Sequence, residues 1–445
     1  MKRSGWRYLW AAQDIRRKLL ITLGLLVIYR FAAHVPVPGV DREALSQLLS
    51  GGGAAGTLLG LLDLLSGGTV SNFSVLAMGV YPYITAQIIL QLLVPIIPSL
   101  QKRMEDDPRE GQRWMEKWTY ILSIPMAALQ AIGQINIFSS LGSVQIIKNF
   151  GFSGASLLPS VTIIVVMTAG TMFAIWLGEL ISEYGIRNQG LSLIIFAGIV
   201  ARIPSNFARL MSDQQNRWFI LAFMLLITLL TIVAIVFIQQ GRRNIPVMYP
   251  GRRIGNRMSM PVKGTLPLMV NMAGMIPLIF AQSILTFPSI LASFFVNSQT
   301  EWVKNLAISA QSAFGGQGNF YWIAYFVMVV LFTFFYTDVL FAQQNYGENL
   351  KRSGARIPGV SPGAPTQRYL TKVLRRITLP GAVFLGIVAI LPWIVGLILP
   401  LGGNTGLLLV SSAGLLIVVG VVRDTFFTIE AELKLHGYDE KLLVR

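Results

Sequence analysis

Few side chains in this sequence have the types and spacing that a catalytic or metal site requires. The 445 residues include no cysteine, which excludes disulfides, thiolate metal sites and thiol catalysis. The two histidines, His34 and His436, have no second metal ligand near them in sequence. The sequence contains no Ser–His–Asp set, HExxH motif, glycine-rich phosphate loop or suitably spaced carboxylate pair. We therefore expect neither an enzyme nor a cofactor or metal site.

Acidic residues in the apolar segments lie near the segment ends. They are Glu179, Glu183, Asp338 and Asp424. A proton or sodium site usually needs an ionisable residue near the middle of the membrane. We therefore assign these carboxylates to interfacial positions, and an ion-coupled transporter is not favoured.

The chemistry that the apolar segments do offer is hydrogen bonding by uncharged polar side chains. Such residues often only join helices within a membrane. They also suit a seam between helices that must separate and close again, because charged pairs would hold such a seam shut. Both interpretations stay open for these residues, which are Thr85, Gln87, Gln91, Gln130, Gln282 and Ser283.

Composition places these residues in a polytopic, all-α membrane protein. The chain is 53% hydrophobic and 13% charged, with a mean hydropathy of +0.61. A spanning helix needs roughly 20 apolar residues, and the sequence contains about ten such runs. No cleavable signal peptide is recognisable at the N-terminus. The runs fall near residues 19–35, 73–97, 114–137, 158–181, 190–204, 217–239, 266–295, 318–342, 377–399 and 404–427.

A short apolar piece precedes the second run. Residues 57–65 are too few to cross a bilayer, and residues 66–68 (Ser-Gly-Gly) form a flexible break before run 73–97. The short piece should therefore lie inside the protein, in a cavity or against a pore. For Asp63, within this piece, a capping or solvated role is as favoured as a functional one. Pro82 predicts a kink within the second run.

Basic residues set the predicted orientation and suggest docking surfaces. Lys and Arg gather in the N-terminal tail and in two long loops, 239–264 and 343–376, which places both termini in the cytoplasm. The tendency of Lys and Arg to remain on the cytoplasmic side of a membrane, together with contact to anionic lipids, explains the net charge of +16. A second interpretation is that the loops dock ribosomal RNA or an acidic motor protein. The candidate docking residues are Arg242, Arg243, Arg252, Arg253, Lys351, Arg352 and Arg356.

Several ordered segments resemble the SecY family, the central subunit of the bacterial protein-conducting channel. The strongest are SNFSVLAMGVYPYITAQIILQLL (71–93) and GTMFAIWLGELISEYGIRNQGLSLIIFAGIV (170–200). Supporting matches are GRRNIPVMY (241–249), NMAGMIPLIFAQSIL (271–285), NLKRSGARIPGVSPGAPT (349–366) and RITLPGAVFLGIVAILP (376–392). The similarity covers nearly the whole chain.

The resemblance implies ten helices in two pseudo-symmetric halves, 1–210 and 211–445, that close like a clamshell around an hourglass pore. It implies a ring of apolar pore residues, namely Val80, Ile84, Leu191, Ile195, Ile279 and Ile417. A plug with its hinge would comprise Leu58, Leu61, Leu62, Leu64, Leu65, Ser66, Gly67 and Gly68. A lateral gate between the halves would include Thr85, Gln91, Gln130, Ser283 and Phe287.

The resemblance also implies the activity and the partners. The chain would conduct unfolded secretory polypeptides across the bacterial plasma membrane and release transmembrane segments laterally into lipid. Expected partners are SecE-type and SecG-type subunits, the SecA motor ATPase, the ribosome, signal sequences, nascent polypeptides and anionic lipids. Energy would come from a partner, because the chain has no recognisable nucleotide site.

Two segments depart from the family pattern. The family commonly has GIGNGIS where this chain has Gly-Ile-Arg-Asn-Gln-Gly-Leu-Ser at 185–192. The family loop IPGxRPG carries an arginine where this chain has Ser361. In the family that arginine is associated with coupling to SecA and the ribosome. We hypothesise that Arg356, five residues earlier, supplies the missing charge.

Two other classes of protein compete with the channel. A secondary transporter of small solutes would need a mid-membrane charge or a polar substrate pocket, and the sequence shows neither. A structural or insertase-only membrane protein would not need a stored half-span or a closed apolar ring.

Overall fold

The computed structural model is built almost entirely of helices, which confirms the helical fold class. It describes residues 13–41, 73–94, 97–141, 151, 154–201, 203–204, 207, 217–250, 253–254, 257–258, 262–296, 300–314, 318–398 and 412–435. The predicted plug and hinge, residues 57–68, and the docking residue Arg252 lie outside the described residues.

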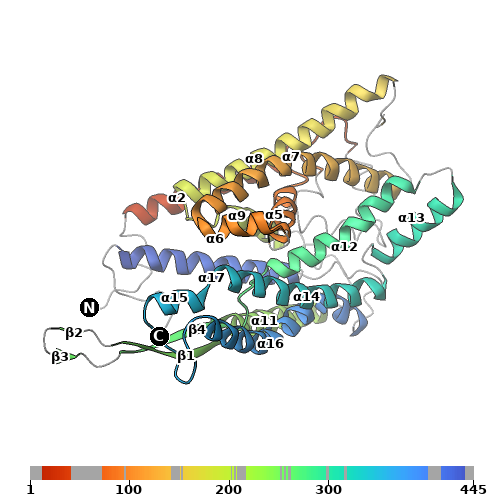
Figure 1. Cartoon of the computed structure of the whole chain (residues 1–445). Helices are drawn as coiled ribbons and strands as arrows, with labels where there is room; N and C mark the ends of the chain where they lie inside the picture. The colour runs from red at the N-terminus through yellow and green to blue at the C-terminus, as the bar shows by residue number, and fades with distance from the viewer. Residues whose placement is uncertain are drawn as a thin grey trace.

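Helices from the first half of the chain pack into one group, drawn from red to yellow in Figure 1. Within it, α7 lies between α5 and α8, while α2 packs against α8 and α9. The elements are α2 (Gln13–Ala32), α5 (Tyr81–Leu93), α6 (Pro98–Asp106), α7 (Pro108–Leu141), η2 (Gly154–Ser156), α8 (Leu157–Tyr184) and α9 (Gly190–Val200).

Helices from the second half form a second group, drawn from green to blue in Figure 1. Here α14 packs against α12 and α16, and α17 packs against α11 and α16. The helices are α11 (Arg217–Gln240), α12 (Ile276–Phe295), α13 (Glu301–Phe314), α14 (Asn319–Gln343), α15 (Tyr346–Arg352), α16 (Ala364–Ile398) and α17 (Ser412–Leu435).

Several helices are suited to a multi-pass membrane protein. Within the described residues, Leu157–Tyr184, Leu221–Gln240, Asn319–Arg352 and Ala364–Gly396 are long and apolar enough to cross a bilayer. The pair α5 and α6, bent by 96°, would make a fifth span if counted together. The predicted number of ten spans stays a prediction.

The second predicted run is not one continuous helix. Residues 73–80 form turns, and the backbone of Ser74 bridges to that of Pro36. Helix α5 begins only at Tyr81, so Pro82 lies in its first turn. The predicted mid-helix kink at Pro82 is therefore wrong. Proline is favourable in a first helical turn, because the amide hydrogen that it lacks has no partner there.

A β-hairpin replaces the loop predicted before the seventh run. Strands β1 (Arg242–Tyr249) and β4 (Val262–Met269) pair antiparallel from Arg242↔Met269 to Tyr249↔Val262. The short strands β2 (Arg253–Ile254) and β3 (Arg257–Met258) pair nearer the tip. The predicted start of the seventh run at residue 266 is wrong, because residues 266–269 belong to β4 and α12 begins at Ile276. The hairpin projects from the same end of the molecule as α15 (Figure 1).

Candidate functional site

A seam between the two helix groups runs along α12, which packs against α7 and α5. Neither α5 nor α12 contains a charged residue. Polar side chains at this seam are uncharged and mostly buried, with Thr85, Gln130 and Ser283 each exposing less than 9% of their surface. The seam is therefore held by apolar packing and neutral hydrogen bonds.

Hydrogen bonds within the first group organise one side of the seam. The Nε2 atom of Gln130 in α7 donates to Oγ1 of Thr85 in α5 at 3.1 Å. Thr85 in turn donates to the Pro82 carbonyl at 2.9 Å. The Oε1 atom of Gln130 is buried and has no hydrogen-bond partner among the described residues. This acceptor could take a hydrogen bond from water or from a segment entering the seam.

Two pairs of polar side chains approach each other across the seam. Tyr81 of α5 lies near Ser283 of α12, whose hydroxyl donates to the Ile279 carbonyl at 2.7 Å, and Gln91 of α5 lies near Tyr336 of α14. Sequence reasoning missed both tyrosines, although each lies in an apolar run and carries a hydroxyl that needs a partner when buried. Phe287 lies one turn beyond Ser283 on α12 and is 44% exposed, so it extends the same face outward.

The six predicted ring residues lie in one apolar region contributed by both helix groups. Val80, Ile195 and Ile417 are buried in the same core cluster, and Leu191 packs against it. Ile279 is buried with Tyr81, and Ile84 packs against both this pair and the main cluster. The contributing elements are α9, α12, α17 and α5, for which Val80 is the N-cap residue. The fold thus gathers side chains that are up to 337 residues apart in sequence, from Val80 to Ile417.

Close packing between α8 and α9 fixes the helix that carries Leu191 and Ile195. Gly190 begins α9, and a methyl group on it would overlap the backbone carbonyl of Gly178 in α8. A methyl group on Gly178 would come within 2.7 Å of the Leu191 side chain. Small residues let membrane helices approach this closely, so Gly190 positions Leu191 and Ile195 against the core cluster.

Substitution of Gly190 by alanine is expected to destabilise the protein by about 2 kcal/mol, because the added methyl group has no space. The measurement is the thermal unfolding midpoint of the purified protein in detergent. Gly24→Ala is the matched control, since Gly24 lies in α2 with no heavy atom near its missing Cβ. Equal midpoints for the two variants would contradict the packing argument.

The β-hairpin and the loop after α15 form one structural unit. Ile245 and Val247 of β1 and Leu268 of β4 point inward, onto a cluster that includes Leu350 and Ile357. The backbone of Met248 exchanges two hydrogen bonds of 2.8 Å with that of Arg356. Arg356 is thereby held as a bridge residue while its side chain remains exposed.

The other predicted docking residues are also placed on this unit. Arg242 and Arg243 begin β1 and are exposed, and Arg253 lies in β2. Lys351 and Arg352 end α15, where Arg352 lies 3.6 Å from Glu348 and is 77% exposed. The structure thus brings the two predicted docking loops together on a single surface.

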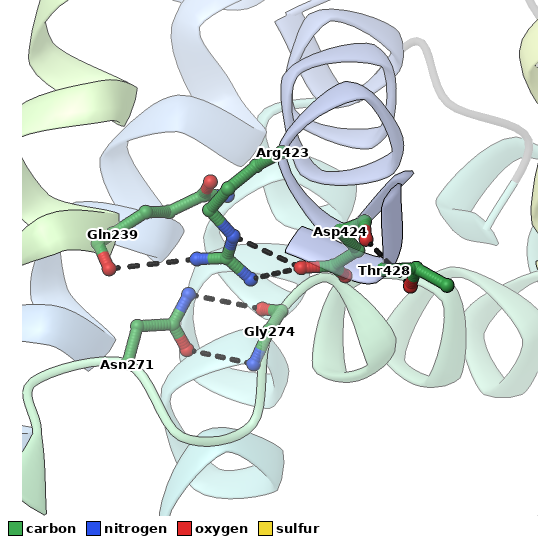
Figure 2. Close-up of polar contacts among 6 residues, drawn as sticks. All are labelled: Gln239, Asn271, Gly274, Arg423, Asp424 and Thr428. Atoms are coloured by element: carbon green, nitrogen blue, oxygen red, sulfur yellow. Dashed lines mark hydrogen bonds and ion pairs between the residues drawn. The ribbon is translucent and has the colours of Figure 1, made fainter. Parts of the chain in front are cut away.

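Two separate sets of polar contacts lie near the root of the hairpin, one between α17 and α11 and one within the turn before α12 (Figure 2). Arg423 of α17 bonds Asp424 at 2.9 and 3.0 Å and donates to the backbone carbonyl of Gln239, near the end of α11, at 3.4 Å. The Asn271 side chain bonds the backbone of Gly274 in both directions, at 2.9 and 3.1 Å. This turn connects β4 to α12 without a long linker, so the hairpin is coupled directly to a helix of the seam.

Comparisons with known proteins agree with this arrangement. A model of the SecY family matches residues 74–426. The chain is 38% identical to the protein translocase subunit SecY of Mycobacterium leprae and 36% identical to that of Streptomyces scabiei, with 96% of each chain covered in both cases.

Two solved structures share the fold. One is described as a protein conducting channel, with a TM-score of 0.59, 18% identity, and 96% of this chain and 95% of the other covered. The second concerns the plug domain of a SecY protein, which stabilises the closed state of that channel, and has a TM-score of 0.60 at the same identity and coverage. The family match and the similar relatives together show that this chain belongs to the SecY family.

Proposed function

We propose that this chain is the channel subunit of a protein translocase, which conducts unfolded polypeptides across a membrane and releases apolar segments through the α5/α7–α12 seam. The observation that carries the proposal is the combination of an uncharged seam with an apolar cluster drawn from both helix groups. Such a role is non-enzymatic, and a partner would supply the energy.

The ring of Val80, Ile84, Leu191, Ile195, Ile279 and Ile417 is the proposed constriction. Apolar constrictions exclude water and ions, while aliphatic side chains can deform around a passing chain. Residues 57–68 remain the predicted plug for this constriction.

The seam is the proposed lateral gate. Separating it would part the neutral polar pairs Tyr81–Ser283 and Gln91–Tyr336 and would break no ion pair with α5 or α12, which contain no charged residue. An apolar segment between the parted helices would then contact lipid and partition according to its hydrophobicity. Release of such a segment therefore needs no covalent chemistry.

The hairpin and the loop after α15 are the proposed docking surface for a SecA-type motor and for ribosomal RNA. Exposed arginines on a shared, rigid surface suit carboxylate and phosphate recognition, because guanidinium groups bind both through paired hydrogen bonds. The turn held by Asn271 and Gly274, which joins β4 to α12, would transmit docking to α12. SecE-type and SecG-type subunits would pack on lipid-facing helices of the channel.

One face of α16 supports the proposed contact with anionic lipid. Exposed Arg368, Lys372 and Arg376 recur every fourth residue, and the exposed apolar residues Leu379, Val383 and Ile387 continue the same face. A row of cations directly above a lipid-facing stripe suits the phosphates of a negatively charged leaflet. This leaflet would be the cytoplasmic one of a bacterial plasma membrane, with both chain termini on that side.

Reconstitution tests the proposed function. The chain is placed in vesicles containing anionic lipid, together with SecE-type and SecG-type subunits, a SecA-type ATPase, ATP and a precursor that carries a signal sequence. We expect the precursor to become protected from added protease in an ATP-dependent manner.

Vesicles without this chain provide the control. A complete absence of protected precursor, together with uptake of a small solute by the same vesicles, would overturn the proposal in favour of a secondary transporter.

A further inference from the structure

Helix α13 leaves two large apolar side chains uncovered. Trp302 and Leu306 are 69% and 62% exposed, and their spacing of four residues places them on one flank of the helix. Two other apolar residues of α13 are used for packing instead: Ala307 is buried, and Phe314 packs against the main core cluster. The exposed flank of Trp302 and Leu306 therefore contributes little to the packing of α13 within the protein.

The remaining face of α13 is polar. Glu301, Asn305 and Ser312 are exposed. At about 100° per residue they project roughly opposite to Ala307 and Phe314, and the flank of Trp302 and Leu306 lies between the two faces. This order of buried, apolar and polar faces suits a helix that packs on a protein while one flank enters the surface of a membrane.

Helix α12 also carries an exposed apolar stripe. Phe287, Leu291 and Phe295 recur every fourth residue and are all exposed. Helix α13 packs beside α12 and lies at the end of the molecule opposite to the hairpin (Figure 1). The stripe of α12 therefore leads along the helix toward the end at which α13 begins, six residues after Phe295.

The length of α12 places the first turn of α13 near the outer membrane surface. From Ile279, in the proposed constriction, to Phe295 the helix rises about 24 Å over 16 residues. Half of the hydrocarbon core of a bilayer measures about 15 Å. With the constriction near the middle of the membrane, the end of α12 reaches the lipid headgroups, and α13 returns beside α12 from that level. Trp302, in the first turn, then lies at the depth where tryptophan is enriched, and Leu306 lies one turn deeper.

A lipid surface fits this flank better than a protein partner does. A stable protein interface buries about 800 Å² on each partner. Two side chains on one flank, bordered by polar residues, do not provide that area. An indole ring at headgroup level with an aliphatic side chain below it needs no partner of complementary shape, because lipid molecules gather around both.

We propose that α13 is an interfacial anchor: Trp302 and Leu306 enter the outer leaflet of the membrane and hold the outer end of α12, one wall of the seam, at a fixed depth. The ligand is lipid at the boundary between headgroups and acyl chains. The depth of the anchor rests on the proposed constriction, whereas its contact with lipid can be measured without any transport.

Single-cysteine variants test the anchor, because the chain contains no cysteine of its own. A small polarity-sensitive dye is attached at Leu306→Cys on the apolar flank or at Asn305→Cys, the adjacent exposed position on the polar face. Leu226→Cys, at an exposed position of a membrane-spanning segment, marks full contact with lipid. Each labelled protein is placed in phosphatidylcholine vesicles with or without lipid that carries a nitroxide on its acyl chain. Iodide serves as the quencher from the water side.

We expect the nitroxide lipid to quench the dye at position 306 at least about threefold more strongly than the dye at position 305, and iodide to show the opposite order. Equal quenching at the two positions would overturn the anchor, because the two faces of α13 would then have the same surroundings. A dye at position 306 that is protected from both quenchers would overturn it in favour of a protein contact. Transport enters none of these measurements, so a failure of the proposed channel function would leave their result intact.

The hold on α12 is tested at its outer end. With the dye at Phe295→Cys, the double substitution Trp302→Ala and Leu306→Ala should raise quenching by iodide about twofold, because the anchor is lost. Glu301→Ala with Asn305→Ala is the matched control and should leave quenching unchanged. All four positions are exposed and alanine favours helices, so α13 itself is retained in both variants. Equal quenching in the two double variants would show that α13 does not set the depth of α12.

Discussion

Replacing Ile279 by asparagine is expected to raise the resting ion conductance of the reconstituted channel by about tenfold or more, because one buried amide can hold water in an otherwise dry constriction. Ile279 is 7% exposed and packs with Tyr81 and Ile84, where the seam meets the proposed ring. Conductance would be measured in planar bilayers with no motor or precursor present, so that only the closed channel contributes.

Two controls accompany this measurement. Ile279→Leu keeps the volume and the apolar character, and should leave the resting conductance nearly unchanged. Leu291→Asn places the same amide on the same helix at a 41% exposed position away from the ring, and should also leave it unchanged. Equal conductance for Ile279→Asn and Leu291→Asn would contradict the assignment of Ile279 to the constriction.

The second large effect is expected from Arg356→Ala, which should weaken binding of a SecA-type motor about tenfold and reduce transport accordingly. A charge-assisted hydrogen bond contributes about 1.5–3 kcal/mol, and 1.4 kcal/mol corresponds to a factor of ten. The substitution removes only the side chain. Both hydrogen bonds between Arg356 and Met248 use backbone atoms, which alanine also has. Motor affinity would be measured with the channel in vesicles.

An arginine introduced at position 361, where the family pattern has one, makes this test specific. Ser361→Arg, introduced together with Arg356→Ala, should restore motor binding if Arg356 compensates for Ser361. Lys304→Ala is the matched control, since Lys304 is an exposed basic residue of α13 that is not part of the proposed docking surface. Unchanged affinity in Arg356→Ala, or no recovery with Ser361→Arg, would contradict the compensation hypothesis.

Boundaries of the elements could be predicted from the sequence only where apolar length decided them. The runs at 158–181 and 318–342 correspond to α8 and α14, because long apolar stretches have no alternative to a helix in lipid. The start of α12 could not be predicted in this way. Residues 266–269 are apolar enough to extend a helix, yet backbone pairing with residues 242–245 holds them in β4.

Tertiary partners also explain the elements that sequence reasoning missed. The helix α13 is short and amphipathic, and its packing against α12 and α14 gives its buried face partners that the sequence does not reveal. Ile245 and Val247 alternate with polar or exposed residues and are buried in β1, but the prolines at 246 and 267 are residues that strands disfavour.

The sequence by itself determined the class of the protein, the absence of charge from the α5 and α12 segments, the basic character of the two docking loops and, through the family resemblance, the candidate ring. These properties depend on composition and on local spacing. Only the tertiary structure decided which residues meet: Tyr81 with Ser283, the backbone of Met248 with that of Arg356, and Lys18 with Glu432. Helical periodicity fixes the face on which a residue lies, but the neighbour of that face depends on how segments distant in sequence pack.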